Sequence, residues 1–285
     1  MRTRSSSPWR PPGRDARRHA SRRCRPSSDT VIHHTVTGTG PDVLLLHGVG
    51  LDHTMWQRCM PELTANHRVT RVDLRGHGAS PPARQGTSLA ELAADVVEVL
   101  DHIGAHRVHL VGFSLGALVA QHIAAHHPAR AATLSLVSSV ALRTPREREA
   151  VLRRLRAART DPAVTADAAV QRWFDEAWRL REPDLVADVR RTLLANDHSS
   201  YLACYTVFAT GDEEVGPLLG RITAPALAIT GSEDPGSTPD MSGRLASAIP
   251  DARVRIVAGA RHLLPLERPR ELAAALTEHF ERITP

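Results

Sequence analysis

Apolar residues recur along the chain in two alternating patterns, short continuous runs and longer stretches with helical spacing. Helical spacing is clearest from Leu89 to Ile103, after the capping-box sequence that begins at Ser88, and again from Pro269 to Phe280. The short runs predict strands at Val31–Thr37, Asp42–Leu46, Val69–Asp73, Val108–Phe113, Thr133–Val137, Ala226–Thr230 and Val254–Val257. Strands that alternate with helices predict an α/β fold, with a mostly parallel central sheet and helices on both of its faces.

The pattern changes between residues 143 and 215. No strand-like run occurs there, charged residues are dense, and apolar positions have helical spacing. The segment also holds a cluster of aromatic residues: Trp173, Phe174, Trp178, Tyr201, Tyr205 and Phe208. We expect a helical lid at 143–215, inserted into a core formed by residues 29–142 and 216–285. The aromatic residues fill the small core of this lid or face a substrate cavity, and the two roles are compatible.

Residues 1–28 are rich in Arg, Pro and Ser, and we expect them to form a disordered tail because they cannot bury a core. The chain contains no lysine, and nine of its 36 basic residues lie within residues 1–30. This stretch carries a net charge of +7. Because the whole chain carries +5, the remaining residues together carry −2. The basic character of the whole chain therefore does not indicate a nucleic-acid partner. A solvated tail is the expectation, with a nucleic-acid-binding arm and a targeting peptide as alternatives.

The remaining composition points away from cofactors and membranes. The three cysteines, Cys24, Cys59 and Cys204, are widely spaced without a metal-ligand pattern, which fits a reducing cytoplasm. No apolar run approaches the roughly 20 residues that span a bilayer. His122 and His126 lie one helical turn apart, but no carboxylate and no second ligand cluster accompanies them in the sequence. We expect a cytoplasmic monomer or homodimer without a metal or other cofactor.

The most informative motif is Gly112-Phe113-Ser114-Leu115-Gly116, which lies between a predicted strand and a predicted helix. Gly-x-Ser-x-Gly at such a junction is typical of the nucleophile elbow of serine hydrolases. The glycines permit a turn so tight that side chains two positions from the serine would collide with the backbone. Ser114 is therefore the predicted nucleophile, and the backbone N–H of Leu115, at a helix N-terminus, is a predicted oxyanion donor.

A serine nucleophile needs a base, and in this architecture the chain order is serine, then acid, then histidine. Asp234 follows the predicted strand Ala226–Thr230 and is the predicted acid, with Glu233 as the fallback. His262 lies in a loop just beyond the strand Val254–Val257 and is the predicted base.

The second oxyanion donor is expected in a loop after an early strand. The apolar run ending at Leu46 leads into His47-Gly48-Val49-Gly50. The backbone N–H of Val49 is the predicted donor, and its side chain is expected to border the pocket. His47 is expected to brace this loop by hydrogen bonding rather than to react.

These motifs resemble those of the α/β-hydrolase superfamily over roughly residues 30–282. The matching segments are His47-Gly48-Val49-Gly50 with Trp56, Asp73-Leu74-Arg75-Gly76-His77-Gly78-Ala79-Ser80, the serine elbow, Gly231-Ser232-Glu233-Asp234 and Gly259-Ala260-Arg261-His262. The resemblance implies an α/β-hydrolase fold with a helical lid inserted after the sixth strand. Dehalogenases and epoxide hydrolases of this fold carry Asp at the elbow, so Ser114 points to acyl chemistry on an ester or lactone.

Within the superfamily the chain looks most like the 3-oxoadipate enol-lactonase group. The segments that carry this resemblance are Arg172-Trp173-Phe174, Tyr201-Leu202-Ala203-Cys204-Tyr205, Asp234-Pro235-Gly236-Ser237-Thr238-Pro239 and Arg261-His262-Leu263. The resemblance implies that Trp173 faces the substrate. A dicarboxylate lactone also requires a cation for its free carboxylate, for which Arg172 and Arg75 are the candidates.

We therefore predict a serine hydrolase of carboxylic esters or lactones that acts on a small molecule through Ser114, His262 and Asp234. One alternative is a carboxylesterase or C–C bond hydrolase with a different substrate. Another is a receptor-like α/β-hydrolase that binds a ligand and has little turnover.

Overall fold

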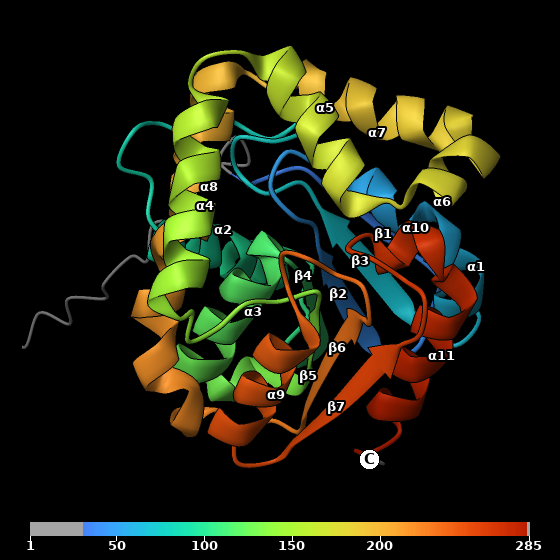
Figure 1. Cartoon of the computed structure of the whole chain (residues 1–285). Helices are drawn as coiled ribbons and strands as arrows, with labels where there is room; N and C mark the ends of the chain where they lie inside the picture. Colours follow the sequence, from blue (N-terminus) through green and yellow to red (C-terminus); the bar gives the residue numbers. More distant parts are fainter. Residues whose placement is uncertain (1–30, 284–285) are drawn as a thin grey trace, which may run out of the picture. The chain divides into compact units, whose positions relative to one another are not determined.

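The computed structural model describes residues 31–283, so the predicted tail 1–28 and Cys24 lie outside the described residues. The described chain forms a seven-stranded sheet in the order β1-β3-β2-β4-β5-β6-β7 (Figure 1). The strands are β1 His34–Thr37, β2 Asp42–Leu46, β3 Arg68–Val72, β4 Val108–Phe113, β5 Ala131–Val137, β6 Ala226–Gly231 and β7 Ala252–Val257. Only β1 is antiparallel to its neighbour, which confirms the predicted mostly parallel sheet.

All the predicted strands are present, and their ends differ from the prediction by three residues at most. The largest difference is at β1, which begins at His34 rather than Val31. Pairing with β3 starts where His34 lies opposite Val72, and the preceding Ile32 is instead buried in the core with 1% of its surface exposed. The predicted strand was therefore too long, because Ile32 is apolar like a strand residue but packs in the core without pairing with β3.

Helices cover both faces of the sheet, as predicted (Figure 1). The helices are α1 Met60–Leu63, α2 Leu89–His102, α3 Leu115–His126, α4 Pro145–Ala158, α5 Pro162–Trp173, α6 Glu176–Arg181, α7 Pro183–Ala195, α8 His198–Val215, α9 Pro239–Ala248, α10 Leu264–Glu267 and α11 Pro269–Phe280. One face carries α1 and α11, and the other carries α2, α3 and α9. The predicted capping box at Ser88 is formed with Glu91. No helix within residues 31–283 has the length and apolar composition needed to cross a membrane.

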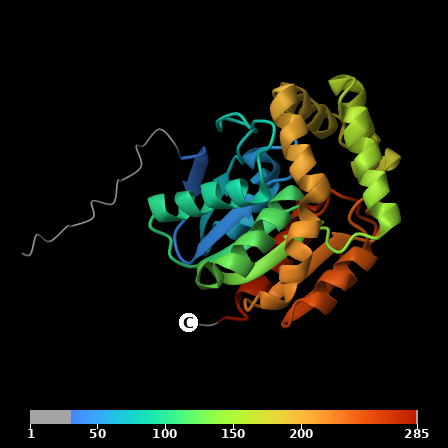
Figure 2. The ribbon, with the colours of Figure 1, turned by 90° about the vertical axis from the view of Figure 1, so that its left-hand side faces the viewer.

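The helices α4 to α8 form one continuous insertion between β5 and β6. This insertion follows the fifth strand of the described sheet and not the sixth, because one strand fewer precedes it than the superfamily resemblance implies. Figure 1 shows α5, α6 and α7 across the top of the sheet, and Figure 2 shows α4 and α8 side by side. The insertion thus stands over the ends of the strands that carry the predicted site residues.

A buried ion pair fastens the two ends of this insertion to each other. Arg143 precedes α4, and its Nη1 lies 2.5 Å from Oδ1 of Asp212 near the end of α8. The backbone N–H of Arg143 donates to the other carboxylate oxygen at 3.1 Å, and Nη1 also donates to the carbonyl of Phe208. Removing one member of a buried pair typically costs about 3–5 kcal/mol because the other charge is left uncompensated. The pair therefore fixes how α4 and α8 leave the sheet.

The loops after β6 and β7 approach each other closely at Gly231, the last residue of β6. A Cβ atom added at Gly231 would lie 2.1 Å from the carbonyl oxygen of Ala260 and 2.4 Å from that of Arg261. Any side chain at this position therefore has to push apart the two loops that carry Asp234 and His262.

We predict that Gly231→Ala lowers stability by about 1–3 kcal/mol, the usual cost of overpacking, and lowers Tm in a thermal melt followed by circular dichroism. Gly243→Ala is the matched control, because a Cβ at this helical position meets nothing within 4 Å. The control is expected to gain about 0.5–1 kcal/mol from better helix propensity. A Gly231→Ala variant that melts at or above the wild-type temperature would contradict the close approach.

Candidate active site

Ser114 lies at the turn between β4 and α3 in a backbone conformation that is rare for residues other than glycine. Its φ is 52° and its ψ is −108°, and such conformations cost about 1–3 kcal/mol. The flanking glycines make the turn possible. A Cβ at Gly112 would lie 2.3 Å from the carbonyl oxygen of Gly116, and a Cβ at Gly116 would lie 2.6 Å from those of Leu46 and His47. The expected reason for both glycines is confirmed.

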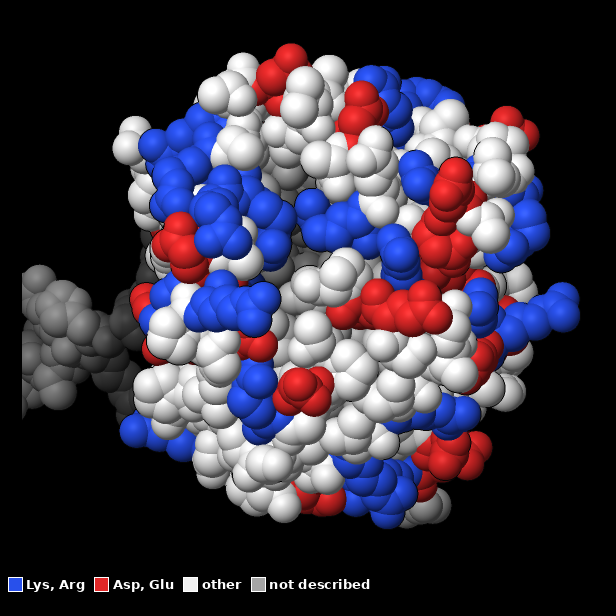
Figure 3. Space-filling model, in the orientation of Figure 1, with Lys and Arg blue, Asp and Glu red and all other residues white. Residues whose placement is uncertain are grey.

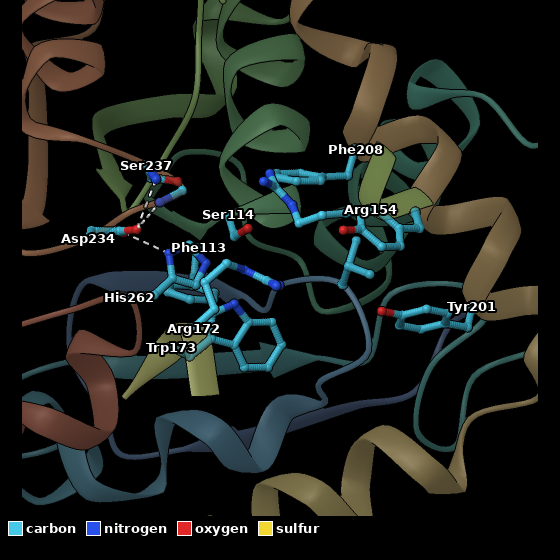
Figure 4. A pocket seen from close by; sticks show the side chains of 13 residues that line it. Phe113, Ser114, Arg154, Arg172, Trp173, Tyr201, Phe208, Asp234, Ser237 and His262 are labelled. Carbon is cyan, nitrogen blue, oxygen red and sulfur yellow. Dashed lines mark hydrogen bonds and ion pairs between the residues drawn. The ribbon is translucent and has the colours of Figure 1, made fainter. Parts of the chain in front are cut away.

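The predicted base and acid are brought together from the loops after β7 and β6. His262 Nδ1 lies 2.7 Å from Oδ2 of Asp234, and both side chains are buried (Figure 4). Oδ1 of Asp234 accepts the backbone N–H groups of Gly236 and Ser237. An ionised carboxylate only accepts hydrogen bonds, so the proton lies on Nδ1 and Nε2 is left as the free acceptor. The fallback residue Glu233 is exposed, and Asp234 is the residue that meets His262.

A cavity lies between the sheet and the helical insertion (Figure 4). Ser114 and His262 both line it, together with Val49, Trp173 and Arg172, which had been predicted to border the substrate. Within residues 31–283 no hydrogen bond joins the Ser114 hydroxyl to His262. Such catalytic hydrogen bonds are often long before substrate is bound.

The predicted oxyanion donors lie on the two elements that flank Ser114. Leu115 is the first residue of α3, where a backbone N–H has no acceptor within its own helix. Val49 borders the cavity from the loop after β2. His47 braces that loop as expected: its Nε2 accepts the N–H of Leu74 at 2.8 Å, and its Nδ1–H donates to the carbonyl of Gly48 at 2.8 Å. Burial lowers the pKa of His47, so the ring stays neutral, and both of its nitrogens are already engaged in these two hydrogen bonds.

The end of α5 is bonded directly to the loop that carries His262, a connection that no sequence pattern indicated. The backbone N–H of His262 donates to the carbonyl of Trp173 at 3.3 Å, and the two rings stack with centroids 5.8 Å apart. Arg261 Nη1 donates to the carbonyls of Gln171 and Phe174 at 3.4 and 3.2 Å. The wall of the cavity and the predicted base therefore share one set of hydrogen bonds.

The structure separates the two arginines proposed to meet a substrate carboxylate. Arg172 lines the cavity, whereas Arg75 forms two hydrogen bonds with the carboxylate of Asp95 and does not line it. The expectation for Arg75 is therefore wrong, because a partner on α2 already holds its charge. The sequence also missed Arg154 of α4, which lines the cavity. No motif distinguishes Arg154 from the other arginines of that helix.

Three side chains near β1 and β3 are close enough to one another to hold a metal ion. The Nδ1 atoms of His33 and His53 lie 2.9 and 2.8 Å from the two oxygens of Asp73. Burial acts to raise the pKa of Asp73, but hydrogen bonds from the N–H groups of Ala79 and His53 outweigh it and lower that pKa. The carboxylate is thus ionised, and the two imidazoles donate to it. These hydrogen bonds account for the cluster as a link between the loops.

The histidine pair on α3 differs from the expectation in one respect. His122 and His126 stack at 4.1 Å, and His122 Nε2 also lies 3.3 Å from a carboxylate oxygen of Glu214 on α8. The sequence indicated no carboxylate because Glu214 is far away along the chain. The contact joins α3 to α8 at a place remote from the cavity lining.

The chain matches the model of the alpha/beta hydrolase family over residues 43–275, and it belongs to this family. It is 27% identical over 257 residues to the (E)-2-((N-methylformamido)methylene)succinate hydrolase of Acinetobacter baylyi, covering 90% of this chain and 96% of that protein. It is 32% identical over 255 residues to the pimeloyl-(acyl-carrier protein) methyl ester esterase of Chromobacterium violaceum, and the match covers 86% of this chain and 96% of that protein. The crystal structure of the enol-lactonase from Burkholderia xenovorans is similar, with a TM-score of 0.82 and 28% identity. The match covers 88% of this chain and 96% of that one. The predicted resemblance to enol-lactonases and the prediction of an ester-bond hydrolase are confirmed.

The loop that carries His262 also depends on a buried carboxylate in α10. Glu267 accepts the backbone N–H of Arg261 at 3.0 Å, and 7% of its surface is exposed. Burial raises the pKa of Glu267 from 4.5 to about 7. Because the folded-state pKa lies above the unfolded value, the contribution of this group to stability is complete below pH 4.5 and is lost as the pH rises through about 7.

We predict that Glu267→Gln, which keeps an acceptor but cannot ionise, gains Tm relative to the wild type as the pH rises from 4.5 to 8. Melting temperatures of the two proteins across this range measure the effect. Glu271→Gln, at an exposed position of α11, is the control and should show no such trend. A difference between Glu267→Gln and wild type that does not change with pH would contradict the raised pKa.

Proposed function

We propose that this member of the α/β-hydrolase family hydrolyses carboxylic esters or lactones of small organic acids through a triad of Ser114, His262 and Asp234. One observation carries the proposal. A serine in a strained turn shares a cavity with a histidine whose Nδ1 is held by a buried carboxylate. This arrangement leaves Nε2 of His262 free to take the serine proton, as the chemistry requires.

Each residue of the proposed site has a separate role in the reaction. Ser114 Oγ attacks the substrate carbonyl while His262 Nε2 removes its proton, and Asp234 stabilises the imidazolium that forms. The N–H groups of Val49 and Leu115 hold the tetrahedral oxyanion. His262 then protonates the leaving alcohol oxygen as the acyl-enzyme forms. In the second half, His262 deprotonates water, which attacks the acyl-enzyme and releases the acid and Ser114. All these steps use protein groups and water alone.

The helical insertion acts in this proposal as a lid that encloses the substrate. Trp173 and Phe208 lie on the cavity side of the insertion, and Figure 4 shows them opposite Ser114. An enclosed aromatic cavity excludes water and strengthens the electrostatic interactions that hold the oxyanion. Trp173 and Arg172 are the proposed substrate-binding residues, since both project into the cavity from the end of α5.

A 3-oxoadipate enol-lactone is the substrate that the resemblance favours. The similarity to an enol-lactonase of known structure extends over most of both chains, and Arg172 lies where a free carboxylate can meet it. A carboxylesterase or C–C bond hydrolase with a different substrate, and a receptor-like protein with little turnover, are the alternatives. A receptor of this kind would keep the same serine turn, so measured turnover and labelling of Ser114 distinguish it from an enzyme.

We predict that Ser114→Ala lowers kcat for ester hydrolysis by about 10⁴-fold or more, since the nucleophile is removed from a group that acts as a unit. A fluorophosphonate probe should label the wild type at Ser114 and leave the variant unlabelled, as read by peptide mass spectrometry. Ser247→Ala, at an exposed position of α9, is the control and should keep both activity and labelling. A folded wild type that neither labels nor hydrolyses any ester would favour the receptor reading.

The proposal that the substrate is an enol-lactone can be tested separately from ester hydrolysis. We predict that kcat/KM for 3-oxoadipate enol-lactone exceeds that for p-nitrophenyl acetate by about tenfold or more, because only the lactone brings a carboxylate to the arginines of the cavity. Steady-state kinetics of both substrates with the same preparation give the ratio. An equal or lower value for the lactone would remove the enol-lactonase assignment and leave ester hydrolysis in place.

A further inference from the structure

We infer that Arg154 of α4 joins Arg172 in holding the free carboxylate of the substrate, and that Arg154 is therefore a specificity-determining residue for esters whose acyl chain ends in a carboxylate. The inference rests on the proposed hydrolysis at Ser114 and adds to it the role of Arg154. The two arginines reach the cavity from different helices, α4 and α5.

Both side chains point to the same space. Figure 4 shows the guanidinium groups of Arg154 and Arg172 extending into the pocket in front of Ser114. On the face shown in Figure 3, basic side chains, all of them arginine in this chain, gather around a hollow above the sheet. Two cations on opposite walls of one cavity can hold the two oxygens of a carboxylate between them.

Neither arginine has an acidic partner among the described residues. The guanidinium of Arg172 makes a single hydrogen bond, to the carbonyl of Ala168 at 3.4 Å, and Arg154 forms no ion pair within residues 31–283. Neighbouring arginines of the same helix differ: Arg148 pairs with Glu213, and both Arg153 and Arg156 pair with Glu149. Three arginines of α4 are thus paired, whereas the two arginines that line the cavity have no acidic partner among the described residues.

The cavity compensates these charges only in part. Burial lowers the pKa of Arg172 and the nearby positive charge of Arg154 lowers it further, whereas Tyr205, Tyr201 and Asp234 act to raise it. Asp234 is the acidic residue among those described that line the cavity, and its oxygens are already used by His262 and by backbone N–H groups. Unpaired charges out of water are costly, and a bound anion relieves that cost. The site is therefore built to receive a negative charge.

The other walls of the cavity indicate what part of the substrate joins that charge to the reacting carbonyl. Phe113, Trp173, Tyr205 and Phe208 line the same cavity as the arginines and Ser114. Aromatic walls suit an aliphatic chain. A substrate with a carboxylate, a short apolar spacer and an ester carbonyl matches these surfaces.

The test uses two esters that differ only at the far end of the acyl chain, mono-p-nitrophenyl adipate and p-nitrophenyl hexanoate. We expect the wild type to prefer the adipate ester by about tenfold to a hundredfold in kcat/KM, as for a charged hydrogen-bonded contact. Arg154→Gln and Arg172→Gln should each reduce this ratio about tenfold. Arg153→Gln, the adjacent residue whose side chain pairs with Glu149 on the outer surface, is the matched control and should keep the wild-type ratio.

A binding measurement separates the role of Arg154 from the chemistry. Adipate should bind to the Ser114→Ala protein in titration calorimetry and bind about tenfold more weakly when Arg154→Gln is added, while melting curves report on folding. Equal preference for the two esters, or adipate binding that neither arginine affects, would overturn the inference. If the wild type hydrolyses neither ester but adipate binding depends on both arginines, the role of Arg154 in carboxylate binding stands and the proposed hydrolysis fails.

Discussion

The turn at Ser114 is the constraint on which the rest of the site depends. Its positive φ is held by bonds to both neighbouring strands: the N–H of Ser114 donates to the carbonyl of Val137 in β5, and the N–H of Gly116 donates to that of His47 after β2. The same bonds that hold the serine in place therefore also fix the loop that supplies Val49. Because neither Gly112 nor Gly116 has room for a Cβ, the turn, the loop that carries Val49 and the end of β5 are packed closely together. Such close packing suits a site whose donors must already point at the oxyanion before the reaction begins.

The helical insertion is joined to this unit at both sides. The buried pair of Arg143 and Asp212 fastens its base, and the carbonyl of Trp173 accepts the N–H of His262 at its far side. A helix that carries the proposed substrate-binding residues is thus bonded to the proposed base. Displacement of α5 would change the position of His262 as well as the shape of the cavity. Substrate contacts on α5 can in this way bear on the geometry of proton transfer, which is how binding energy from a remote group comes to assist catalysis.

The sequence predicted the strands, the serine elbow and the order of Ser114, Asp234 and His262, because strand ends and turns leave strong local patterns. The structure brings the three residues to one cavity, since parallel strands present their carboxyl ends at one edge of the sheet. Side-chain direction leaves no such pattern. Arg75 looked suitable and is held by Asp95, whereas Arg154 looked like an ordinary surface arginine and faces the cavity. Which arginine finds a carboxylate depends on helices packed from distant parts of the chain, and sequence spacing does not contain that information.

The distribution of arginines also bears on the chemistry itself. In the proposed mechanism His262 becomes positively charged during acylation, and two unpaired guanidinium groups in the same cavity oppose that charge. A substrate carboxylate held, as proposed, between Arg154 and Arg172 would cancel their field at the moment the imidazolium forms. Its effect is then larger in the transition state than in the ground state, where His262 is neutral, so the contact assists the chemical step as well as binding. The proposed arrangement thus favours hydrolysis of a carboxylate-bearing ester over that of a neutral one.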